Sequence, residues 1–278
     1  MGTSLVIFIR GGGDLASGVA LRLHRAGLRL LITELPQPLV VRRWVSFASA
    51  VYQGQVTVEG ITAVHATHLQ QALAIMAEGN IPVLVDPEFA SLSALRSPLS
   101  ASTPIVLVDG RMTKQPVEYP LDAANLILGL GPGFVAGQNC HAVVETNRGH
   151  RLGRVIWNGA PEADTGIPEQ VNRFTAERVL RSPADGRLLA HAEIGDHLEP
   201  GQLVAEVDGH SIYAPLRGVL RGLLYPGVRV WRGMKIGDID PRDDPSHCAL
   251  VSDKSLAVGG GVLEALLSRS ELRPYLWD

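Results

Sequence analysis

The sequence has little cysteine, no excess of positive charge and no long hydrophobic run. Its two cysteines, Cys140 and Cys248, are too few for a disulfide framework and suit a reducing compartment. A formal net charge of −3 offers no basic surface for nucleic acid or for an anionic membrane. We therefore expect neither a disulfide-stabilised secreted domain nor a nucleic-acid partner.

Membrane insertion and secretion have no support in the sequence either. The longest stretch without Asp, Glu, Lys or Arg covers residues 123–144, and Pro132 and four glycines interrupt it, so its composition is not that of a membrane span. The first apolar run has no basic segment before it and ends at Arg10, unlike a signal peptide. We expect a cytoplasmic protein with no membrane partner.

The chain does contain enough apolar sequence for a large core. Hydrophobic residues make up 46% and charged residues 19% of the 278 residues, a composition typical of globular proteins rather than of disordered ones. The length predicts one large domain or two smaller ones. The apolar runs described below are compatible with a homo-oligomer but do not require one.

The first 34 residues have the pattern of a βαβ unit. An apolar run at residues 5–9 leads into Gly11-Gly12-Gly13-Asp14-Leu15-Ala16, which fits G-x-G-x-x-A. Apolar residues then recur at helical spacing as far as Gly27, and a second apolar run at residues 28–33 ends at Glu34. Strand, glycine turn, helix, strand and acid in this order predict a dinucleotide-type binding site.

The physical basis of such a site is the approach of the backbone to a phosphate. Glycines admit a pyrophosphate, amides at the helix start bind it, and Glu34 would hold a ribose. The alternative is a tight turn without a ligand, and Asp14 would repel a phosphate unless a metal or a proton intervened. Arg42 and Arg43 follow closely and suit bidentate phosphate binding, although a solvated charged pair explains them equally well.

Further apolar runs continue the same alternation. Helical spacing over residues 69–78 precedes a run at 81–85, and two more runs cover 105–108 and 126–130. This alternation predicts an α/β fold with a doubly wound, mostly parallel, Rossmann-like sheet. Ligands of such sheets bind at the carboxyl ends of the strands, where the chain places Asp86, Asp109 and a second glycine loop with Gly131 and Gly133.

An internal repeat follows the α/β pattern. Seven residues between Pro183 and Val207 recur 32 positions later, between Pro215 and Ile239, which predicts two similar β units. The module resembles the barrel-sandwich hybrid of biotinyl and lipoyl domains. The turn that carries the modified lysine in those domains is residues 207–211 here and has no lysine, so we expect no biotin or lipoate. We expect a Rossmann-like domain at 1–178, this module at 179–242, and a helical segment at 243–278 that packs on the first domain.

Candidates for chemistry are few. Asp109, His141 and Lys254 are the polar residues we single out, and the sequence leaves open whether the chain is an enzyme. Cys140 next to His141 suggests a sulfur-carrying thiolate, but neighbours in a strand face opposite sides, which favours a buried, inert cysteine. His141, Glu145 and His150 match no known metal-ligand spacing, and we predict no metal site.

Taken together, these motifs resemble those of the YqeB-type accessory proteins of selenium-dependent molybdenum hydroxylase systems, which are related to XdhC-like maturation factors. The resemblance implies a role in maturing a molybdenum hydroxylase, with the molybdenum cofactor or a pterin dinucleotide as ligand. It implies a hydroxylase subunit or another maturation factor as partner. Nearly the whole chain carries it, in residues 13–18, 33–36, 42–47, 108–112, 129–134, 141–146, 148–150, 153–156, 182–242, 252–254 and 259–264.

The residues and the resemblance together lead to one hypothesis with two alternatives. The leading hypothesis is an accessory protein that binds a phosphorylated, nucleotide-like ligand. An NAD(P)-dependent oxidoreductase is the first alternative, although the chain has no Tyr-x-x-x-Lys or comparable acid–base spacing. A non-enzymatic scaffold that docks a hydroxylase subunit is the second.

Overall fold

The chain divides into two compact units in the computed structural model, which describes residues 5–95, 103–115, 119–164, 166 and 174–277. Unit 1 comprises residues 1–38, 47–164 and 251–278, and unit 2 comprises residues 39–46 and 165–250. These boundaries differ from the expected division at residues 178 and 242. Residues 39–46 join unit 2 because their arginines bind its backbone, as described below.

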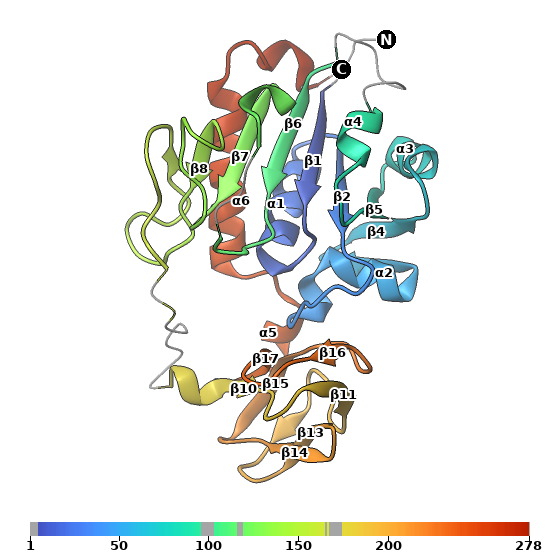
Figure 1. The fold of residues 1–278 in the computed structure, drawn as a ribbon, viewed down its shortest axis with the longest axis vertical. Helices are drawn as coiled ribbons and strands as arrows, with labels where there is room; N and C mark the ends of the chain where they lie inside the picture. The colour runs from blue at the N-terminus through green and yellow to red at the C-terminus, as the bar shows by residue number, and fades with distance from the viewer. Residues whose placement is uncertain (1–4, 96–102, 116–118, 165, 167–173, 278) are drawn as a thin grey trace. The chain divides into compact units, whose positions relative to one another are not determined.

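Unit 1 is built on a mixed, mostly parallel sheet (Figure 1). In the part of the chain that the structure describes, its strand order is β3-β4-β5-β2-β1-β6-β7-β8-β9. All neighbours from β4 to β8 are parallel, and both edge strands pair in the antiparallel sense. This confirms an α/β class with a large sheet. The strands are β1 (Val6–Arg10), β2 (Leu30–Glu34), β3 (Gln55–Val58), β4 (Ile61–Ala66), β5 (Ile81–Val85), β6 (Ile105–Asp109), β7 (Leu126–Leu130), β8 (Ala142–Val144) and β9 (Val155–Ile156).

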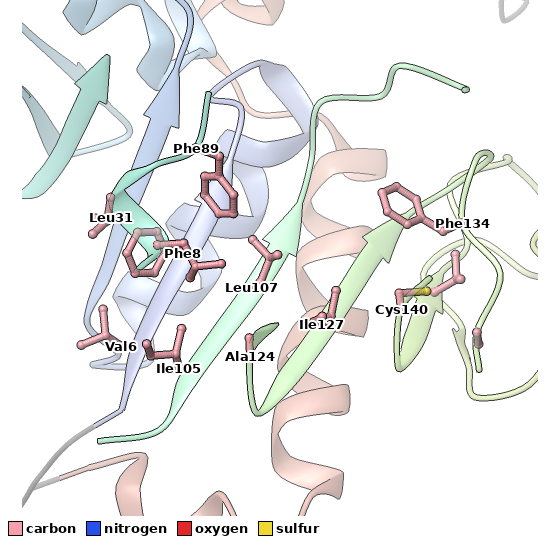
Figure 2. Close-up of a cluster of buried hydrophobic side chains, with 13 residues drawn as sticks. Val6, Phe8, Leu31, Phe89, Ile105, Leu107, Ala124, Ile127, Phe134 and Cys140 are labelled. Carbon is pink, nitrogen blue, oxygen red and sulfur yellow. The ribbon is translucent and has the colours of Figure 1, made fainter. Parts of the chain in front are cut away.

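Helices cover both faces of this sheet. Side chains from α3 and α4 join Phe8, Leu31 and Leu107 in a buried cluster on one face (Figure 2). Helices α1 and α6 pack against each other and against β1, β2, β8 and β9, on the opposite face in Figure 1. The helices are α1 (Asp14–Arg25), α2 (Ala50–Gln53), α3 (Leu69–Ala77), α4 (Ser91–Leu95) and α6 (Asp253–Ser268), with 3₁₀ turns η2 (Phe47–Ser49), η3 (Leu121–Ala123) and η5 (Arg273–Tyr275).

Glycines allow α1 and α6 to approach closely. A Cβ added to Gly18 would lie 2.5 Å from Cβ of Ser255, and one added to Gly259 would lie 2.9 Å from the carbonyl oxygen of Gly18. A Cβ on Gly261 would overlap the carbonyl oxygen of Gly153, whereas one on Gly260 would meet nothing within 4 Å. Two of the three consecutive glycines in α6 therefore serve helix packing.

Unit 2 consists of two four-stranded antiparallel sheets, β10-β17-β15-β12 and β14-β13-β11-β16, in the described residues. The repeat is structural, because β11, β12 and β13 recur 32 residues later as β15, β16 and β17. Strand β12 pairs with β15 and β16 pairs with β11, so each repeat contributes a strand to the other sheet. The bounds are β10 (Val179–Arg181), β11 (Gly186–Ala190), β12 (His197–Leu198), β13 (Leu203–Val207), β14 (His210–Tyr213), β15 (Gly218–Leu223), β16 (Arg229–Val230), β17 (Lys235–Asp240), α5 (Ser246–Ala249), η1 (Arg43–Val45) and η4 (Ala176–Arg178).

Candidate functional site at the carboxyl ends of β1 and β6

The glycine turn after β1 is occupied by groups of the protein itself. The Gly12 amide donates to Oε2 of Glu34 at 2.7 Å, and the Gly12 carbonyl accepts from the Ala48 amide at 2.9 Å. A Cβ on Gly12 would lie 2.9 Å from that amide nitrogen. Burial raises the pKa of Glu34, and hydrogen bonds from the Leu35 and Gly12 amides oppose the shift. Glu34 therefore occupies the Gly12 amide, and Ala48 packs closely over Gly12.

The start of α1 lies at the same edge of the sheet. Gly13, Asp14 and Leu15 are partly exposed there, whereas Ala16 is buried. Oδ1 of Asp14 accepts from the Ser255 hydroxyl at 2.9 Å, which ties this carboxylate to the first turn of α6. The helix start therefore remains the open part of the predicted glycine motif.

The two arginines after β2 belong to unit 2. Arg42 donates to the carbonyl oxygens of His247 and Leu250, both at 2.9 Å. Arg43 donates from Nε to the carbonyl oxygen of Leu223 at 2.6 Å, and burial lowers its pKa. Both guanidinium groups bind backbone carbonyls within their own unit.

A row of polar side chains lies at the ends of three adjacent strands. Thr33, Arg10 and Asp109 are register partners on β2, β1 and β6. Residues in register on parallel strands point to the same face, here the face that carries Phe8 (Figure 2). The strand order reverses at β1, with β2 on one side and β6 on the other, and open α/β sheets bind ligands at such a point.

Asp109 organises the side chains around it. It is 1% exposed; Arg111 donates to Oδ1 from Nε at 3.0 Å and to Oδ2 from Nη2 at 2.6 Å. The Tyr119 hydroxyl donates to Oδ2 at 2.7 Å and accepts from Nη1 of Arg10 at 2.8 Å. Burial, together with the Asp109 carboxylate, raises the pKa of Tyr119 to about 12. Burial alone would lower the pKa of Arg111, but Asp109 raises it above its ordinary value.

Arg111 therefore pairs directly with the Asp109 carboxylate, whereas Arg10 is linked to it through the Tyr119 hydroxyl. Arg10 makes no ion pair among the described residues, and its guanidinium carbon lies 4.8 Å from the centre of the Phe89 ring. The cluster of Arg10, Asp109, Arg111 and Tyr119, which we call the edge cluster, carries one net positive charge. Such a cluster can receive an anion without removing an existing ion pair.

Three residues close to the edge cluster have a strained backbone conformation. Phe89, Met112 and Lys114 adopt left-handed conformations with φ of 58°, 55° and 60°. Bulky side chains rarely adopt this region, at a cost of about 1–3 kcal/mol per residue, and residues held there concentrate at binding sites. Phe89 contacts Arg10, and Met112 follows Arg111 directly.

The loops after β6 and β7 meet at this edge. Gly131 packs against the Thr146 side chain, and a Cβ on Gly133 would lie 2.5 Å from the carbonyl oxygen of Gln115. Both glycines thus serve the packing of loops against each other. Asp86, at the end of β5, accepts from the Ala90 amide at 2.9 Å and the Ser91 amide at 2.8 Å and so begins α4.

Of the remaining candidates, Cys140 and His141 precede the amino end of β8, away from the edge cluster. Nδ1 of His141 accepts from the Ile127 amide at 2.9 Å, near the amino end of β7, and burial followed by the charge of Arg269 lowers the pKa of this ring. Cys140 is fully buried, and burial raises the pKa of its thiol to about 11, so it stays protonated at neutral pH. Lys254 lies in the first turn of α6.

Sequence reasoning selected Asp109 but missed Arg10, Arg111 and Tyr119 as its partners. A signal for Arg10 was present, because a charged residue ending a buried strand directly before a glycine turn must have a local partner. Among the described residues, no group of three or more His, Cys, Asp or Glu side chains is arranged to hold a metal ion. No helix in the described ranges is long and apolar enough to cross a membrane.

Fold and site define unit 1 as an α/β unit with a mostly parallel sheet and a charged cluster at its carboxyl edge. No protein-family model matches the chain. A curated protein of Escherichia coli K12, named uncharacterized protein YqeB, is 46% identical over 262 residues, which is 94% of this chain. The resemblance to YqeB-type proteins is therefore confirmed. The chain spans 47% of the length of that relative.

Solved structures offer only distant likenesses. An aspartoacylase family protein from Mesorhizobium loti is 11% identical, with 85% of each chain covered and a TM-score of 0.28. The product-bound ectoine utilization protein EutE of Ruegeria pomeroyi is 18% identical, with 30% of this chain and 27% of that chain covered and a TM-score of 0.22. Scores this low carry no argument about fold or function.

Proposed function

We propose that unit 1 binds a phosphorylated, nucleotide-like ligand at the carboxyl ends of β1 and β6. The observation that carries the proposal is the edge cluster, in which Arg111 pairs with the buried carboxylate of Asp109 and Arg10 is linked to it only through the Tyr119 hydroxyl. A phosphate there would accept from the guanidinium groups and from the backbone amides at the start of α1. In this view unit 1 is a Rossmann-type fold, and unit 2 is a barrel-sandwich hybrid without a modified lysine.

The biological role that we propose is that of an accessory protein in the maturation of a molybdenum hydroxylase, including selenium-dependent ones. The similarity to YqeB supports this role through the resemblance described above. The donor set of the edge cluster and the helix start suits the phosphate end of the molybdenum cofactor or of a pterin dinucleotide. When bound, such a ligand would supply the redox chemistry, and the residues of this chain would bind and orient it.

Two other functions deserve comparison with this one. A nicotinamide-dependent oxidoreductase has less support, because Ala48 covers Gly12 and Glu34 already binds its amide. The same observation favours a scaffold as the second candidate, since a glycine turn filled by the protein needs no ligand. In that case the partner, a hydroxylase subunit, would bind unit 2.

The experiment that separates these functions is calorimetric titration of the full chain with ADP, a stable phosphorylated nucleotide. We expect the parent chain to bind ADP and Arg10→Gln to bind it at least about tenfold more weakly, because a hydrogen bond to a charged group contributes about 1.5–3 kcal/mol. Arg25→Gln is the matched control, since Arg25 is an exposed arginine at the far end of α1, where it pairs with Glu59. Equal affinity of parent and Arg10→Gln would contradict the proposal.

A further inference from the structure

Two buried hydroxyl groups near Arg10 have no hydrogen-bond partner among the described residues. Thr33 is 1% exposed and Ser91 is 7% exposed, yet Oγ1 of Thr33 and Oγ of Ser91 both lack a partner there. An unpaired buried hydroxyl destabilises the folded state, so such groups are rare in proteins. Thr33 lies near the end of β2, and Ser91 begins α4, which follows β5, the neighbour of β2 in the sheet.

The sheet register brings the first hydroxyl next to Arg10. Thr33 is the register partner of Arg10, and adjacent strands are about 4.8 Å apart. Leu31, two residues before Thr33, packs in the cluster with Phe8, so Thr33 points to the same face as Phe8 and Arg10. Thr33 and Arg10 therefore present a hydroxyl and a guanidinium side by side.

Asp86 brings the second hydroxyl to the same edge. The Asp86 amide donates to the Glu34 carbonyl at 3.0 Å, and its carboxylate accepts from the Ser91 amide at 2.8 Å. These two bonds connect Ser91 to the end of β2, one residue beyond Thr33. Phe89, between Asp86 and Ser91 in the chain, packs on Phe8 with ring centres 6.0 Å apart, which keeps this segment over the Arg10 face.

We infer that Thr33, Ser91 and Arg10 form the subsite for a terminal phosphate group, a compact oxyanion. This inference rests on the proposed function and specifies which group of the ligand enters which part of the edge. Two hydroxyl donors and one guanidinium match the acceptors of a phosphate monoester. Residues 87–89 contact the Arg10 guanidinium only weakly, because the Pro87 carbonyl lies 3.4 Å from Nη2 of Arg10. Phe89 also has a strained, left-handed backbone. An anion that displaced this segment would therefore break a weak hydrogen bond and relieve backbone strain.

The test compares Thr33→Val with Thr33→Ser in the full chain, with inorganic phosphate as the probe. Valine has the shape of threonine without the hydroxyl, and serine retains the hydroxyl. Thr33→Val is expected to raise the dissociation constant for phosphate about tenfold and to melt at a temperature no lower than the parent, because the unpaired hydroxyl is gone. Thr33→Ser is expected to bind phosphate within about twofold of the parent.

The outcomes distinguish the subsite from the wider proposal. If Thr33→Val binds phosphate as tightly as the parent, or if the parent binds no phosphate, the subsite is wrong. If Arg10→Gln still binds ADP more weakly than the parent, the proposed function stands and only the placement of the phosphate at Thr33 and Ser91 is wrong. If neither variant changes any affinity, both the subsite and the proposed function are overturned.

Discussion

Asp238 is a fully buried carboxylate that more than one cation surrounds. Its exposed fraction is 0%, and Oδ2 accepts from Arg178 at 2.8 Å and from Arg221 at 2.5 Å. Burial alone would raise the pKa of Asp238, but Lys235, Arg221 and Arg178 together hold it well below its ordinary value of 3.8. The network ties η4 and β15 to β17, and so joins both ends of unit 2.

Replacement of this carboxylate is expected to destabilise unit 2. Asp238→Asn should lower its free energy of unfolding by about 3 kcal/mol at pH 7, because the buried Arg178 loses the counter-charge it binds and Arg221 keeps only Asp240. The depressed pKa means that the unfolded chain binds more protons just below pH 3.8, so the stabilisation is complete above that pH and declines as the solution becomes more acidic. The difference between parent and variant in urea unfolding should therefore be smaller at pH 2.5 than at pH 7.

The control for this prediction is an exposed ion pair. Asp164 pairs with Lys114 at 2.9 Å, and both side chains are more than one-third exposed. Asp164→Asn should change stability by less than about 1 kcal/mol. Two results would contradict a stabilising role of the buried network. One is a loss of unfolding free energy for Asp164→Asn as large as that for Asp238→Asn. The other is a loss for Asp238→Asn that is the same at pH 2.5 and pH 7.

At the scale of elements, the packing of α6 on its neighbours depends on which of its glycines faces another backbone. Gly260→Ala places a methyl group in open space within a helix and should stabilise unit 1 by up to about 1 kcal/mol, the helix preference for alanine. Gly261→Ala places the same group against the Gly153 carbonyl and should destabilise it by about 1–3 kcal/mol. Urea unfolding of the two variants provides the comparison, and opposite signs are the expected result.

Equal effects of these two substitutions would contradict the close approach of the helix to its neighbours. The pair is well matched, because the residues are adjacent and the chemical change is identical. Their sequence context alone, three consecutive glycines, does not distinguish them. Helix preference would predict the same gain at both positions, so only tertiary packing produces a difference.

Local sequence patterns predicted most elements of unit 1 correctly. The apolar runs at 81–85 and 126–130 coincide with β5 and β7, because strands buried on both faces of a parallel sheet are continuously apolar. The hairpin of β3 and β4 was missed, since β3 is an exposed edge strand with a single buried residue, Val58. Its signal is the two-residue turn Glu59-Gly60, in which both residues have positive φ.

The candidate site was harder to predict than the fold. Asp109 could be selected because it ends an apolar run, but Arg10 and Tyr119 are separated by 109 residues and meet only in the folded sheet. The arginine pair at 42–43 was considered for phosphate binding, besides a solvated charged pair, because it is close in sequence to the glycine turn. In the structure it belongs to unit 2, where its guanidinium groups bind backbone carbonyls.

At the scale of the whole molecule, the two units have different properties. Unit 1 contains the edge cluster, the left-handed Phe89 and Met112 next to it, and the unpaired hydroxyls of Thr33 and Ser91, and the proposed site is built from these. Unit 2 contains two interlocked antiparallel sheets and a turn at Asp208-Gly209 without a lysine. The proposal therefore assigns the phosphorylated ligand to unit 1 alone, and a partner protein, where one binds, to unit 2.

Hydrogen–deuterium exchange of the full chain with and without ADP tests this assignment most directly. Backbone amides at residues 10–17 and 105–115 should exchange more slowly with ADP present, because a ligand at the ends of β1 and β6 restrains both loops. Amides at residues 186–213 should exchange at the same rate in both samples. Slower exchange confined to unit 2, or unchanged exchange at 10–17 and 105–115 with ADP bound, would contradict a binding site at this edge of the sheet.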